Sequence, residues 1–518
     1  MASARPGRVA RGLAALVFGQ GIRTFGHLLL VPLYLRYWSA TAYGEWLALA
    51  SLTAYLSAFD LGINTAGVNR LTQSYARGDT EAYAQDQASA LAFYGVVAGV
   101  GSMLLALAAW ALPLAEWLGL RAIPPDEAGW VAWLLGVQIL LAMPVGFLAA
   151  VYRTTGRLAW TEWLGNTRAL AALTLVPVVL GLGGGMPALA AAQLLPLSAV
   201  GAFVLWDMHR RWPAFVPRLS LARMSALRGL LGPSLLFALM TLANALTLQG
   251  SVLLIVSRLG GAVVAVFVVS RTLTNLIRQT VFTVNNALWP HLTALEATGD
   301  YQGLRVMHRL SVLGSVVLSV TAAAALWEVG GEVITSWTGG RLVPDMLLLH
   351  LLLVQLVLQA PWVASSVLPM AFNRPHVLAA ASAAASVTGL AVAALLMDVL
   401  GAGAVPVGLI VGEALACYVF VPREACRLAR ADHRVFAARQ WGALAVAVAL
   451  AFPAAWVAAW AVPGPLALRW ILVGVTALAS SALAAWLVGL GADERALVTR
   501  AGRASLERLG LLPATQGV

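Results

Sequence analysis

The sequence is poor in charged residues. They make up 11% of its 518 residues, where a soluble domain carries roughly 25%. Hydrophobic residues account for 60% of the chain, and the mean hydropathy is +0.83. A soluble protein of this length could not cover its surface with so few charges. The composition therefore excludes a soluble enzyme and favours a chain that spans a membrane many times.

Lysine is missing altogether, since all 33 basic residues are arginine. This excludes a P-loop nucleotide site, which needs a lysine to reach the phosphates. It also excludes Schiff-base catalysis by a lysine amine. The only cysteines, Cys417 and Cys426, lie nine positions apart in one expected helix and its extension. A helical rise would separate them by roughly 13 Å, which is too far for a disulfide.

Long apolar runs occupy most of the chain. A helix crosses a bilayer with about 20 apolar residues, and runs of this length recur along the sequence with short connections between them. We therefore predict an all-α polytopic membrane protein with about 14 transmembrane helices. The expected spans are 12–36, 43–66, 87–113, 128–152, 158–181, 186–207, 229–256, 262–289, 308–330, 345–372, 376–398, 402–422, 440–462 and 466–490.

The arginines predict the orientation of these spans. With the N-terminus inside, 24 arginines fall on the inner side and 5 on the outer side, and the other 4 lie within spans. Basic residues concentrate in cytoplasmic loops, so this bias predicts that both termini are cytoplasmic and that the number of spans is even. Basic loops also explain the formal charge of +11 without a nucleic-acid partner.

A short motif occurs twice, 221 residues apart. Residues 70–79 and 291–300 share five identical positions, including the pairs Gly78-Asp79 and Gly299-Asp300. Each copy follows the second span of its half, on the same side of the membrane. A shift of six spans keeps the two halves parallel. We therefore predict two six-helix bundles related by a pseudo-twofold axis along the membrane normal, an arrangement known from transporters, followed by two C-terminal helices.

These patterns divide the chain into six parts. We predict an N-terminal six-helix bundle at 1–207, a cytoplasmic basic linker at 208–228, a C-terminal six-helix bundle at 229–422, a cytoplasmic basic loop at 423–439, two extra transmembrane helices at 440–490 and a cytoplasmic tail at 491–518. The arginines and aromatic residues of the linker fit an amphipathic stretch on the anionic leaflet. They equally fit a solvated loop that fixes the topology.

Polar residues in four spans follow helical spacing, so that each set shares one face of its helix. In span 8 the spacing joins Arg271, Asn275 and Arg278, and Asn285 continues near the same line. The candidate cavity residues taken from all four spans are Gln20 and Arg23 in span 1, Asp60 in span 2, Asn244 in span 7, and Arg271, Asn275, Arg278 and Asn285 in span 8. Spans 1 and 2 are the counterparts of spans 7 and 8 in the two predicted halves, which favours a central polar cavity.

The candidate cavity is cationic, because Arg23, Arg271 and Arg278 face a single carboxylate, Asp60. Arginine matches phosphate with a planar fork of donors. The cavity therefore favours an anionic cargo such as a phosphate or pyrophosphate, and it argues against a cationic drug. An alternative role for polar residues at span depth is hydrogen bonding between helices. Glu413 in span 12 and Gln355 in span 10 fit either a coupling-ion site or such a contact.

Several short motifs resemble one transporter superfamily. Span 2 opens with Tyr43-Gly44-Glu45-Trp46, and Phe59-Asp60-Leu61-Gly62 is followed by the loop Ala76-Arg77-Gly78-Asp79. The second half adds Leu288-Trp289-Pro290 and Ala297-Thr298-Gly299-Asp300. Over spans 1 to 12 the chain resembles the multidrug/oligosaccharidyl-lipid/polysaccharide exporter superfamily, and within it the polysaccharide biosynthesis or O-antigen flippase branch, which often has two extra C-terminal helices.

The resemblance implies a MATE-like, V-shaped pair of bundles that works by alternating access. It implies a flippase, not an enzyme, that moves a polyprenyl-pyrophosphate-linked oligosaccharide across the inner membrane of a bacterium for O-antigen (lipopolysaccharide) or exopolysaccharide biosynthesis. Arg23, Arg271 and Arg278 would then hold the pyrophosphate, and the four amide residues Gln20, Asn244, Asn275 and Asn285 would contact sugar hydroxyls. No cofactor or resident metal is implied. The coupling ion, a proton or sodium, stays open.

The implied partners are the lipid-linked glycan, membrane lipids, and the polymerase or glycosyltransferases of the same biosynthesis. Two alternatives remain. A lipid II flippase of the same superfamily also has a cationic cavity, so the arginines do not separate the two. A polytopic glycosyltransferase or O-antigen polymerase would be an enzyme, but such enzymes usually need a sizeable external loop, and the expected external connections here are short.

Overall fold

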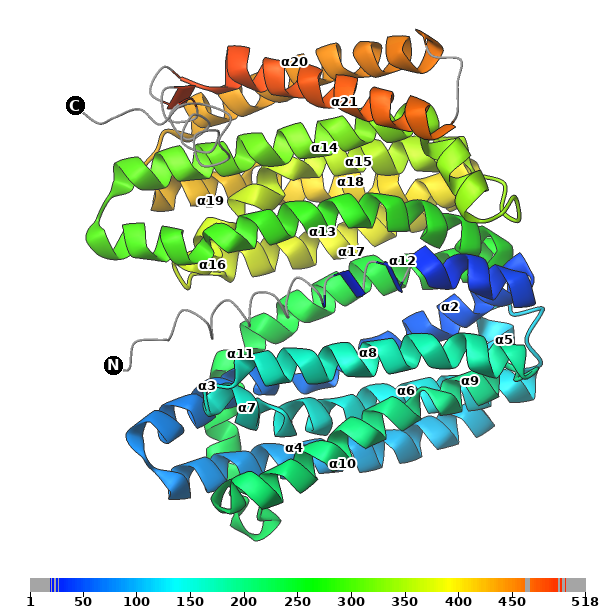
Figure 1. Ribbon diagram of the computed structural model, residues 1–518, viewed down its shortest axis with the longest axis vertical. Helices are drawn as coiled ribbons and strands as arrows, with labels where there is room; N and C mark the ends of the chain where they lie inside the picture. Colours follow the sequence, from blue (N-terminus) through cyan, green and yellow to red (C-terminus); the bar gives the residue numbers. More distant parts are fainter. Residues whose placement is uncertain are drawn as a thin grey trace. The chain divides into compact units, whose positions relative to one another are not determined.

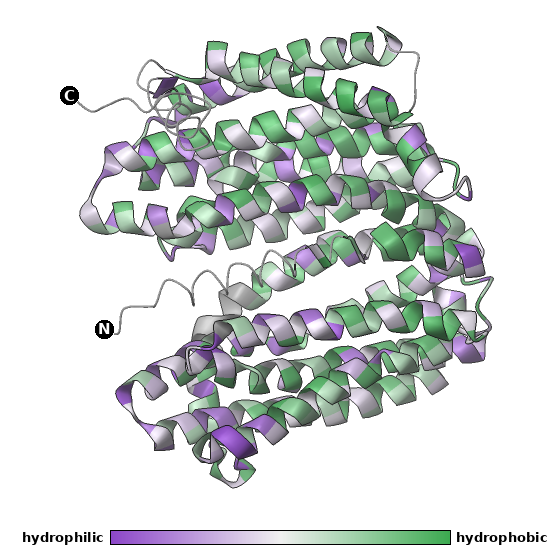
Figure 2. Ribbon diagram, viewed as in Figure 1, coloured by the Kyte–Doolittle hydropathy of each residue, from purple (hydrophilic) through white to green (hydrophobic). Residues whose placement is uncertain are grey.

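The computed structural model describes residues 19, 21, 22, 25, 26, 28–461, 466–491, 494, 495 and 499. All secondary structure within these residues is helical (Figure 1), as expected for an all-α chain. Twelve of the described helices are long and apolar enough to cross a membrane, and Figure 2 shows hydrophobic residues along most of their length. The prediction of a multi-pass helical membrane protein is confirmed at this level.

The chain divides into two compact units. Unit 1 contains Met1–Val269, Thr335–Val343 and Met397–Ala402, and unit 2 contains Ser270–Ile334, Pro344–Leu396 and Gly403–Val518. The division falls inside the long helix α13 (Gly261–Thr298), whose first turns belong to unit 1. The predicted domain limits at 207, 229 and 422 remain predictions, because the units interleave along the chain.

Unit 1 contains the helices before α13. They are α2 (Ala40–Ala54), η1 (Tyr55–Asp60), α3 (Ile63–Arg77), α4 (Thr80–Ala111), α5 (Leu114–Trp117), α6 (Pro125–Leu148), α7 (Ala150–Thr154), α8 (Leu158–Gly181), α9 (Met186–Ala192), α10 (Leu194–Arg211), η2 (Pro213–Phe215), η3 (Leu219–Leu221), α11 (Met224–Ala245), the π-helix η4 (Leu246–Gly250) and α12 (Ser251–Leu259). A further apolar helix, Leu28–Tyr37, precedes α2.

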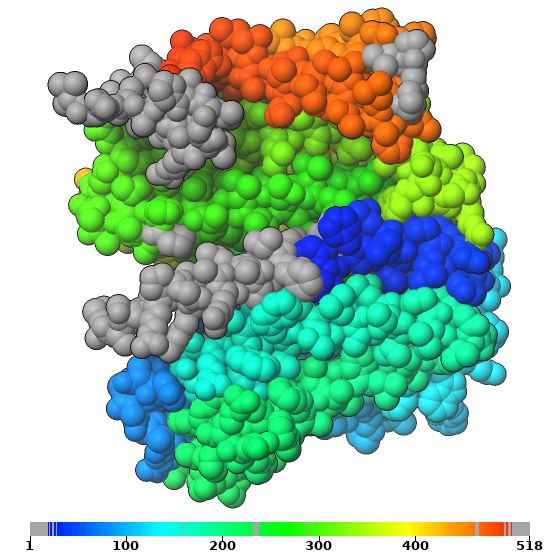
Figure 3. All heavy atoms as spheres, in the orientation of Figure 1, coloured from blue at the N-terminus to red at the C-terminus, as the bar shows by residue number. Residues whose placement is uncertain are grey.

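Most of unit 2 is built from α13 and the helices after it. They are α14 (Tyr301–Trp337), α15 (Met346–Ser365), α16 (Val367–Ala371), α17 (His376–Leu400), η5 (Gly401–Gly403), α18 (Ala404–Ala416), α19 (Phe420–Leu428), α20 (His433–Ala461), α21 (Leu466–Ala484) and the π-helix η6 (Ala485–Gly489). The last two long helices, α20 and α21, lie side by side along one margin of unit 2 (Figures 1 and 3).

Helices α17 and α18 form an antiparallel hairpin held by glycines. Gly408 and Gly412 are four residues apart on α18. A Cβ atom at Gly408 would lie 2.3 Å from the carbonyl oxygen of Gly389, and one at Gly412 would lie 2.3 Å from that of Ala385. Small residues at this spacing let membrane helices approach backbone to backbone. The segment from α17 through α18, which counts as one of the twelve candidates, therefore turns back on itself. The total of 14 remains a prediction, because the first span lies largely outside the described residues.

Span 2 is interrupted, which corrects the continuous helix expected at 43–66. The helix α2 passes into the 3₁₀-helix η1, and Leu61 and Gly62 then take the left-handed conformation with φ of 50° and 73°. An L-residue in this conformation costs roughly 1–2 kcal/mol, so surrounding contacts must hold Leu61 there. The chain resumes as α3 and stays helical as far as Arg77, about 11 residues beyond the expected end.

The two copies of the repeated motif have the same local structure. Gly78 and Gly299 adopt φ of 72° and 71° and end α3 and α13. The following aspartates cap the next helices, since Asp79 accepts a bond from the amide of Ala82 at 2.9 Å and Asp300 from that of Gly303 at 2.8 Å. Glycine supplies the left-handed helix end and aspartate the N-cap. The Gly-Asp pair thus makes one tight turn in each copy, and the parallel layout of whole bundles remains a prediction.

The motif Tyr43-Gly44-Glu45-Trp46 holds α2 inside unit 1. A Cβ atom at Gly44 would lie 1.7 Å from the carbonyl oxygen of Gly261, so only glycine permits this backbone contact. The fully buried Glu45 carboxylate accepts bonds from the three consecutive backbone amides of residues 121–123, at 2.6 to 3.0 Å. Backbone donors satisfy this buried charge. The motif therefore fixes α2 against the α5–α6 turn and the start of α13.

The basic segment after α10 docks on unit 1 through its aromatic residues. Phe215 lies 4.6 Å from the ring of Tyr83, and Trp212 lies 5.7 Å from the ring of Tyr152, measured between ring centroids. Both tyrosines belong to the buried core of this unit. The segment therefore lies against unit 1, with Trp212 and Phe215 packed on the buried core of this unit. The two roles considered for this segment, an amphipathic stretch on the anionic leaflet and a solvated loop that fixes the topology, both remain predictions.

Candidate functional site

A polar stripe runs along α13 where this helix enters unit 2. Arg271, Asn275 and Arg278 are spaced by four and three residues, so they share one face of the helix. All three are partly buried in a helix apolar enough to cross a membrane. Arg271 and Arg278 are close enough to interact electrostatically. A pair of guanidinium groups at this depth requires an anionic partner or water.

The buried carboxylate of Glu413 on α18 supplies one anionic partner. Its side chain is 7% exposed and accepts hydrogen bonds from Gln355 Nε2 at 3.0 Å and from Trp362 Nε1 at 3.2 Å, both on α15. Glu413 also attracts Arg278 electrostatically. Two neutral donors therefore fix the carboxylate, and α13, α15 and α18 converge on one charged cluster within unit 2.

The cluster contains two guanidinium groups, those of Arg271 and Arg278, and the carboxyl group of Glu413. The oxygens of Glu413 are already bonded to Gln355 and Trp362. A desolvated cationic excess binds an anion more strongly than the same charges would in water. The guanidinium fork adds geometric selectivity for phosphate or carboxylate oxygens. The chemistry available here is therefore anion binding at span depth.

Asn285 lies farther along α13 and is used between helices. Its amide nitrogen donates to Ser315 Oγ at 2.9 Å and to the carbonyl oxygen of Val281 at 2.7 Å, and its amide oxygen accepts a bond from Ser311. The residue is 1% exposed. These bonds join α13 to α14, so in this conformation Asn285 has the interhelical role weighed from the sequence. Its contact with sugar remains a prediction.

Asp60 lies at the interruption of span 2 in unit 1. It ends η1, and its carboxylate accepts a hydrogen bond from the hydroxyl of the buried Tyr94 on α4. Leu61 and Gly62 follow in the left-handed conformation. Broken helices in transporters often mark sites where backbone and side-chain polar groups meet a substrate or ion. Asp60 is the carboxylate closest in sequence to such a break.

The structure describes fewer contacts for the remaining candidate residues. Asn244 is exposed and lies on α11, two residues before the π-helix η4, and such π-bulges are frequent at functional sites. Gln20 and Arg23 lie outside the described residues. The neighbouring Gly19 and Gly26 lie close to Asn166 and Leu173 of α8.

Sequence reasoning located the stripe but not the whole cluster. Helical spacing alone grouped Arg271, Asn275 and Arg278. Glu413 and Gln355 were recognised only as isolated polar residues, and Trp362 gave no polar signal. A carboxylate in an apolar span is itself the signal that could have marked the site.

Among the described residues, no group of three or more His, Cys, Asp or Glu could hold a metal ion.

No protein-family model and no curated protein matches the sequence. Solved structures do match the fold. A multidrug-resistance MATE transporter of the MOP superfamily, in an inward-facing conformation, aligns with a TM-score of 0.65 and 16% identity, covering 78% of this chain and 98% of the other. A MOP superfamily transporter from Pyrococcus furiosus, described as having a binding pocket of reverse polarity, aligns with a TM-score of 0.58 and 15% identity, over 81% and 96%.

The lipid II flippase MurJ, in an inward closed conformation, aligns with a TM-score of 0.66 and 9% identity, covering 92% of this chain and 98% of the other. These neighbours are transporters and a flippase. At such low identity the likeness concerns the fold. The chain described here has the fold shared by MATE transporters of the MOP superfamily and by the lipid II flippase MurJ.

Proposed function

We propose that this protein is a flippase of the MOP superfamily that moves a polyprenyl-pyrophosphate-linked oligosaccharide across the cytoplasmic membrane of a bacterium. The observation that carries this proposal is the charged cluster of unit 2, where Arg271 and Arg278 share one face of α13 and Glu413 acts on Arg278. A pyrophosphate carries the charge and the oxygen acceptors that this pair of guanidinium groups can bind.

The other candidate residues then have distinct roles. Arg271 and Arg278 bind the pyrophosphate together with Arg23 of the first span, and Asn275, Asn244, Asn285 and Gln20 provide amides for sugar hydroxyls. Asp60 balances charge at the broken helix of span 2. The prenyl chain stays in lipid, alternating access carries the head group across, and a proton or sodium gradient or the membrane potential drives the cycle. Both termini lie in the cytoplasm.

The cargo fits biosynthesis of a surface polysaccharide, either an O-antigen of lipopolysaccharide or an exopolysaccharide, with the polymerase and glycosyltransferases of that biosynthesis as candidate partners. Lipid II is a second candidate cargo. One observation favours it, since the alignment with the lipid II flippase MurJ covers 92% of this chain and that with the inward-facing MATE transporter covers 78%. A cationic drug is disfavoured, because it would meet two arginines at the site.

The test is translocation of lipid-linked oligosaccharide in proteoliposomes, comparing the wild type with Arg271→Ala and Arg278→Ala. Each variant loses a charge-assisted contact to phosphate, so we expect transport to fall roughly tenfold or more. Arg439→Ala is the matched control, because Arg439 is an exposed arginine in the basic loop region, and it should transport normally. Each variant must elute as a folded species. Equal rates in all four proteins would show that the cluster does not bind the cargo.

The same vesicles distinguish the two candidate cargoes. A polyprenyl-pyrophosphate carrying a surface-polysaccharide repeat unit and lipid II are offered in parallel. Faster movement of the repeat unit supports the proposed branch. Movement of lipid II alone would support the second candidate, with the arginine cluster acting in the same way.

A further inference from the structure

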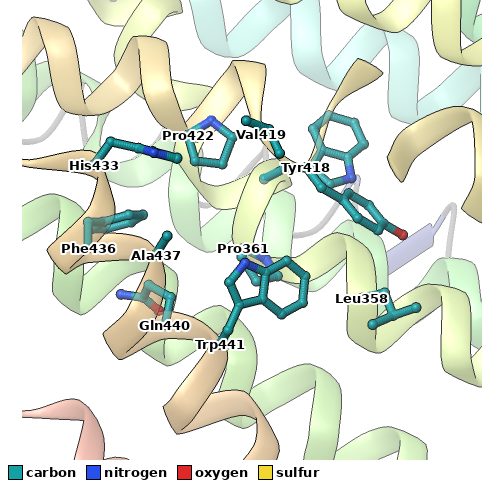
Figure 4. Close-up of a pocket in the computed structure, with 11 residues that line it drawn as sticks. Leu358, Pro361, Tyr418, Val419, Pro422, His433, Phe436, Ala437, Gln440 and Trp441 are labelled. Carbon is teal, nitrogen blue, oxygen red and sulfur yellow. The ribbon is translucent and has the colours of Figure 1, made fainter. Parts of the chain in front are cut away.

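A region of unit 2 at the predicted cytoplasmic end of α20 adjoins the Glu413 cluster, because Trp362 contacts both. A cavity of about 80 Å³ is enclosed by α15, by the segment from Tyr418 to Pro422, and by the start of α20. Five of its lining residues follow α20 from His433 to Trp441 at steps of three and four, so they form one face of that helix. Figure 4 shows this face opposite Tyr418 and Pro422, with Pro361 of α15 between them.

This mainly apolar cavity contains a buried polar group without a hydrogen bond among the described residues. Gln440 is 4% exposed, lines the cavity, and has an amide oxygen without a hydrogen bond among the described residues. A buried amide without a partner is costly. Much of the remaining lining is aromatic, as at Phe436 and Trp441, and Tyr418 and His433 add two further polar groups. The cavity therefore fits a mainly apolar molecule with one polar group at that depth.

A wider basic cleft lies beside the cavity. It has a volume of about 580 Å³ and is lined by Arg423, Arg427, Glu424 and His433, and His433 also lines the first cavity. Arg427 is paired with the buried Glu424 at 2.6 Å. The exposed Arg423 therefore supplies the excess positive charge. The cleft is complementary to an anionic group.

The surface around both cavities is apolar. Val419, Phe420 and Trp441 are 49%, 52% and 37% exposed. In a chain that spans a membrane, such a surface faces lipid, so a ligand reaches the site from the bilayer. The positive-inside bias places this end on the cytoplasmic side, where anionic lipids are attracted to basic clusters beside membrane helices.

We propose that this site binds an anionic phospholipid of the cytoplasmic leaflet. The phosphodiester lies against Arg423 and His433, and the glycerol ester region reaches the Gln440 amide. His433 and Gln440 are seven residues apart, or roughly 10 Å along a helix, so the two contacts follow one line along α20. The first turn of an acyl chain then contacts Trp362 and Trp441. This inference needs only membrane insertion and does not rest on the proposed cargo.

The test is native mass spectrometry of the full-length protein in detergent, with phosphatidylglycerol or phosphatidylcholine of identical chains added. We expect the wild type to retain phosphatidylglycerol selectively. Arg423→Gln should lower this retention roughly fivefold, and Gln440→Leu should lower it as well. Arg434→Gln is the matched control, because Arg434 is an exposed arginine of the same segment that does not line the cleft, and it should retain the lipid fully.

Three outcomes would overturn the proposal. Equal retention of the two lipids by the wild type would remove the charge selectivity. An equal loss in Arg434→Gln and Arg423→Gln would show diffuse attraction to a basic surface. Displacement of the bound lipid by inorganic phosphate alone, or by an equal amount of polyprenyl phosphate, would identify a soluble anion or the transported lipid as the true ligand.

Discussion

At the scale of single residues, charges in this protein are satisfied in two different ways. Glu45 is fully buried, but the backbone amides of residues 121–123 surround its carboxylate. Arg271 and Arg278 instead lie two turns apart on one face of α13, and Glu413 acts on Arg278. A carboxylate that backbone donors saturate has little capacity left for a ligand. Glu45 is therefore structural, and cargo binding is proposed for the two arginines.

The role of Glu45 predicts a stability defect in Glu45→Gln. The substitution replaces one accepting oxygen with an NH₂ group that faces backbone donors, so we expect the free energy of unfolding to fall by about 2 kcal/mol. Thermal unfolding in detergent measures the change. Glu116→Gln, at an exposed position on α5, should shift stability by no more than about 0.5 kcal/mol. Equal midpoints for Glu45→Gln and the wild type would show that the amide turn does not depend on this charge.

Both cysteines should resist thiol reagents in the folded protein. Cys417 and Cys426 are fully buried. Burial raises the pKa of the Cys426 thiol to about 12, with a smaller rise from Asp432 that Arg309 partly offsets. Alkylation needs the thiolate, and a raised pKa keeps the thiolate scarce at every pH below it. Maleimide should label neither cysteine near neutral pH until the chain is denatured.

A matched control for this experiment is Ala222→Cys, which places a thiol at an exposed position between α10 and α11. This variant should label quickly in the folded state, at that thiol only. Rapid labelling of the native wild type, followed by mapping to Cys426, would show that the segment around α19 opens in solution.

At the scale of elements, glycine decides where helices stop and how closely they pack. Gly78 and Gly299 end α3 and α13 in the left-handed conformation, and Gly408 and Gly412 bring α18 against the backbone of α17. These two uses are physically different. The first needs the backbone freedom of glycine, and the second needs its missing side chain.

The hairpin predicts a large effect of Gly412→Ala. The added Cβ would lie 2.3 Å from the carbonyl oxygen of Ala385. Because that neighbour is backbone, the two helices must separate, and we expect a loss of roughly 2–3 kcal/mol in stability. Thermal unfolding in detergent again provides the measurement. The control Gly442→Ala adds a Cβ that meets nothing within 4 Å on α20, so it should be neutral or stabilising. A wild-type midpoint for Gly412→Ala would contradict the close packing of α17 and α18.

The sequence predicted most spans because apolar length is a strong signal. It missed the break in span 2, since Asp60, Leu61 and Gly62 interrupt an otherwise apolar run too briefly to change its hydropathy. It also expected one helix through Cys417 and Cys426, whereas α18 ends at Ala416 and α19 begins at Phe420. In both places contacts between helices determine the backbone conformation. The local sequence pattern carries no information about such contacts.

The candidate site shows the same limit. Spacing along one helix correctly grouped Arg271, Asn275 and Arg278, because a single helix determines which of its residues share a face. Spacing could not assign Glu413 as a partner of Arg278, because that interaction joins α13 to α18 across a large sequence distance. It also could not show that Asn285 is bonded to Ser311 and Ser315. Only packing between helices decides which polar residues remain available.

At the scale of the whole molecule, the distribution of arginines and the helical fold both fit a protein that crosses the membrane many times. The arginines concentrate in the predicted cytoplasmic segments, the helices follow the fold of MATE transporters and of MurJ, and the two arginines of unit 2 lie just beyond the point where α13 leaves unit 1. In the proposed function, this part of α13 binds the pyrophosphate.

The most direct measurement compares two cargoes in proteoliposomes that contain only the wild-type protein. One is a polyprenyl-pyrophosphate-linked oligosaccharide, followed by its accessibility to an external glycosidase, and the other is a fluorescent cationic drug. We predict that the oligosaccharide lipid crosses the bilayer well above the rate in protein-free vesicles and that the cation does not. Export of the cation without movement of the lipid would contradict an anionic cargo and would identify the protein as a multidrug transporter.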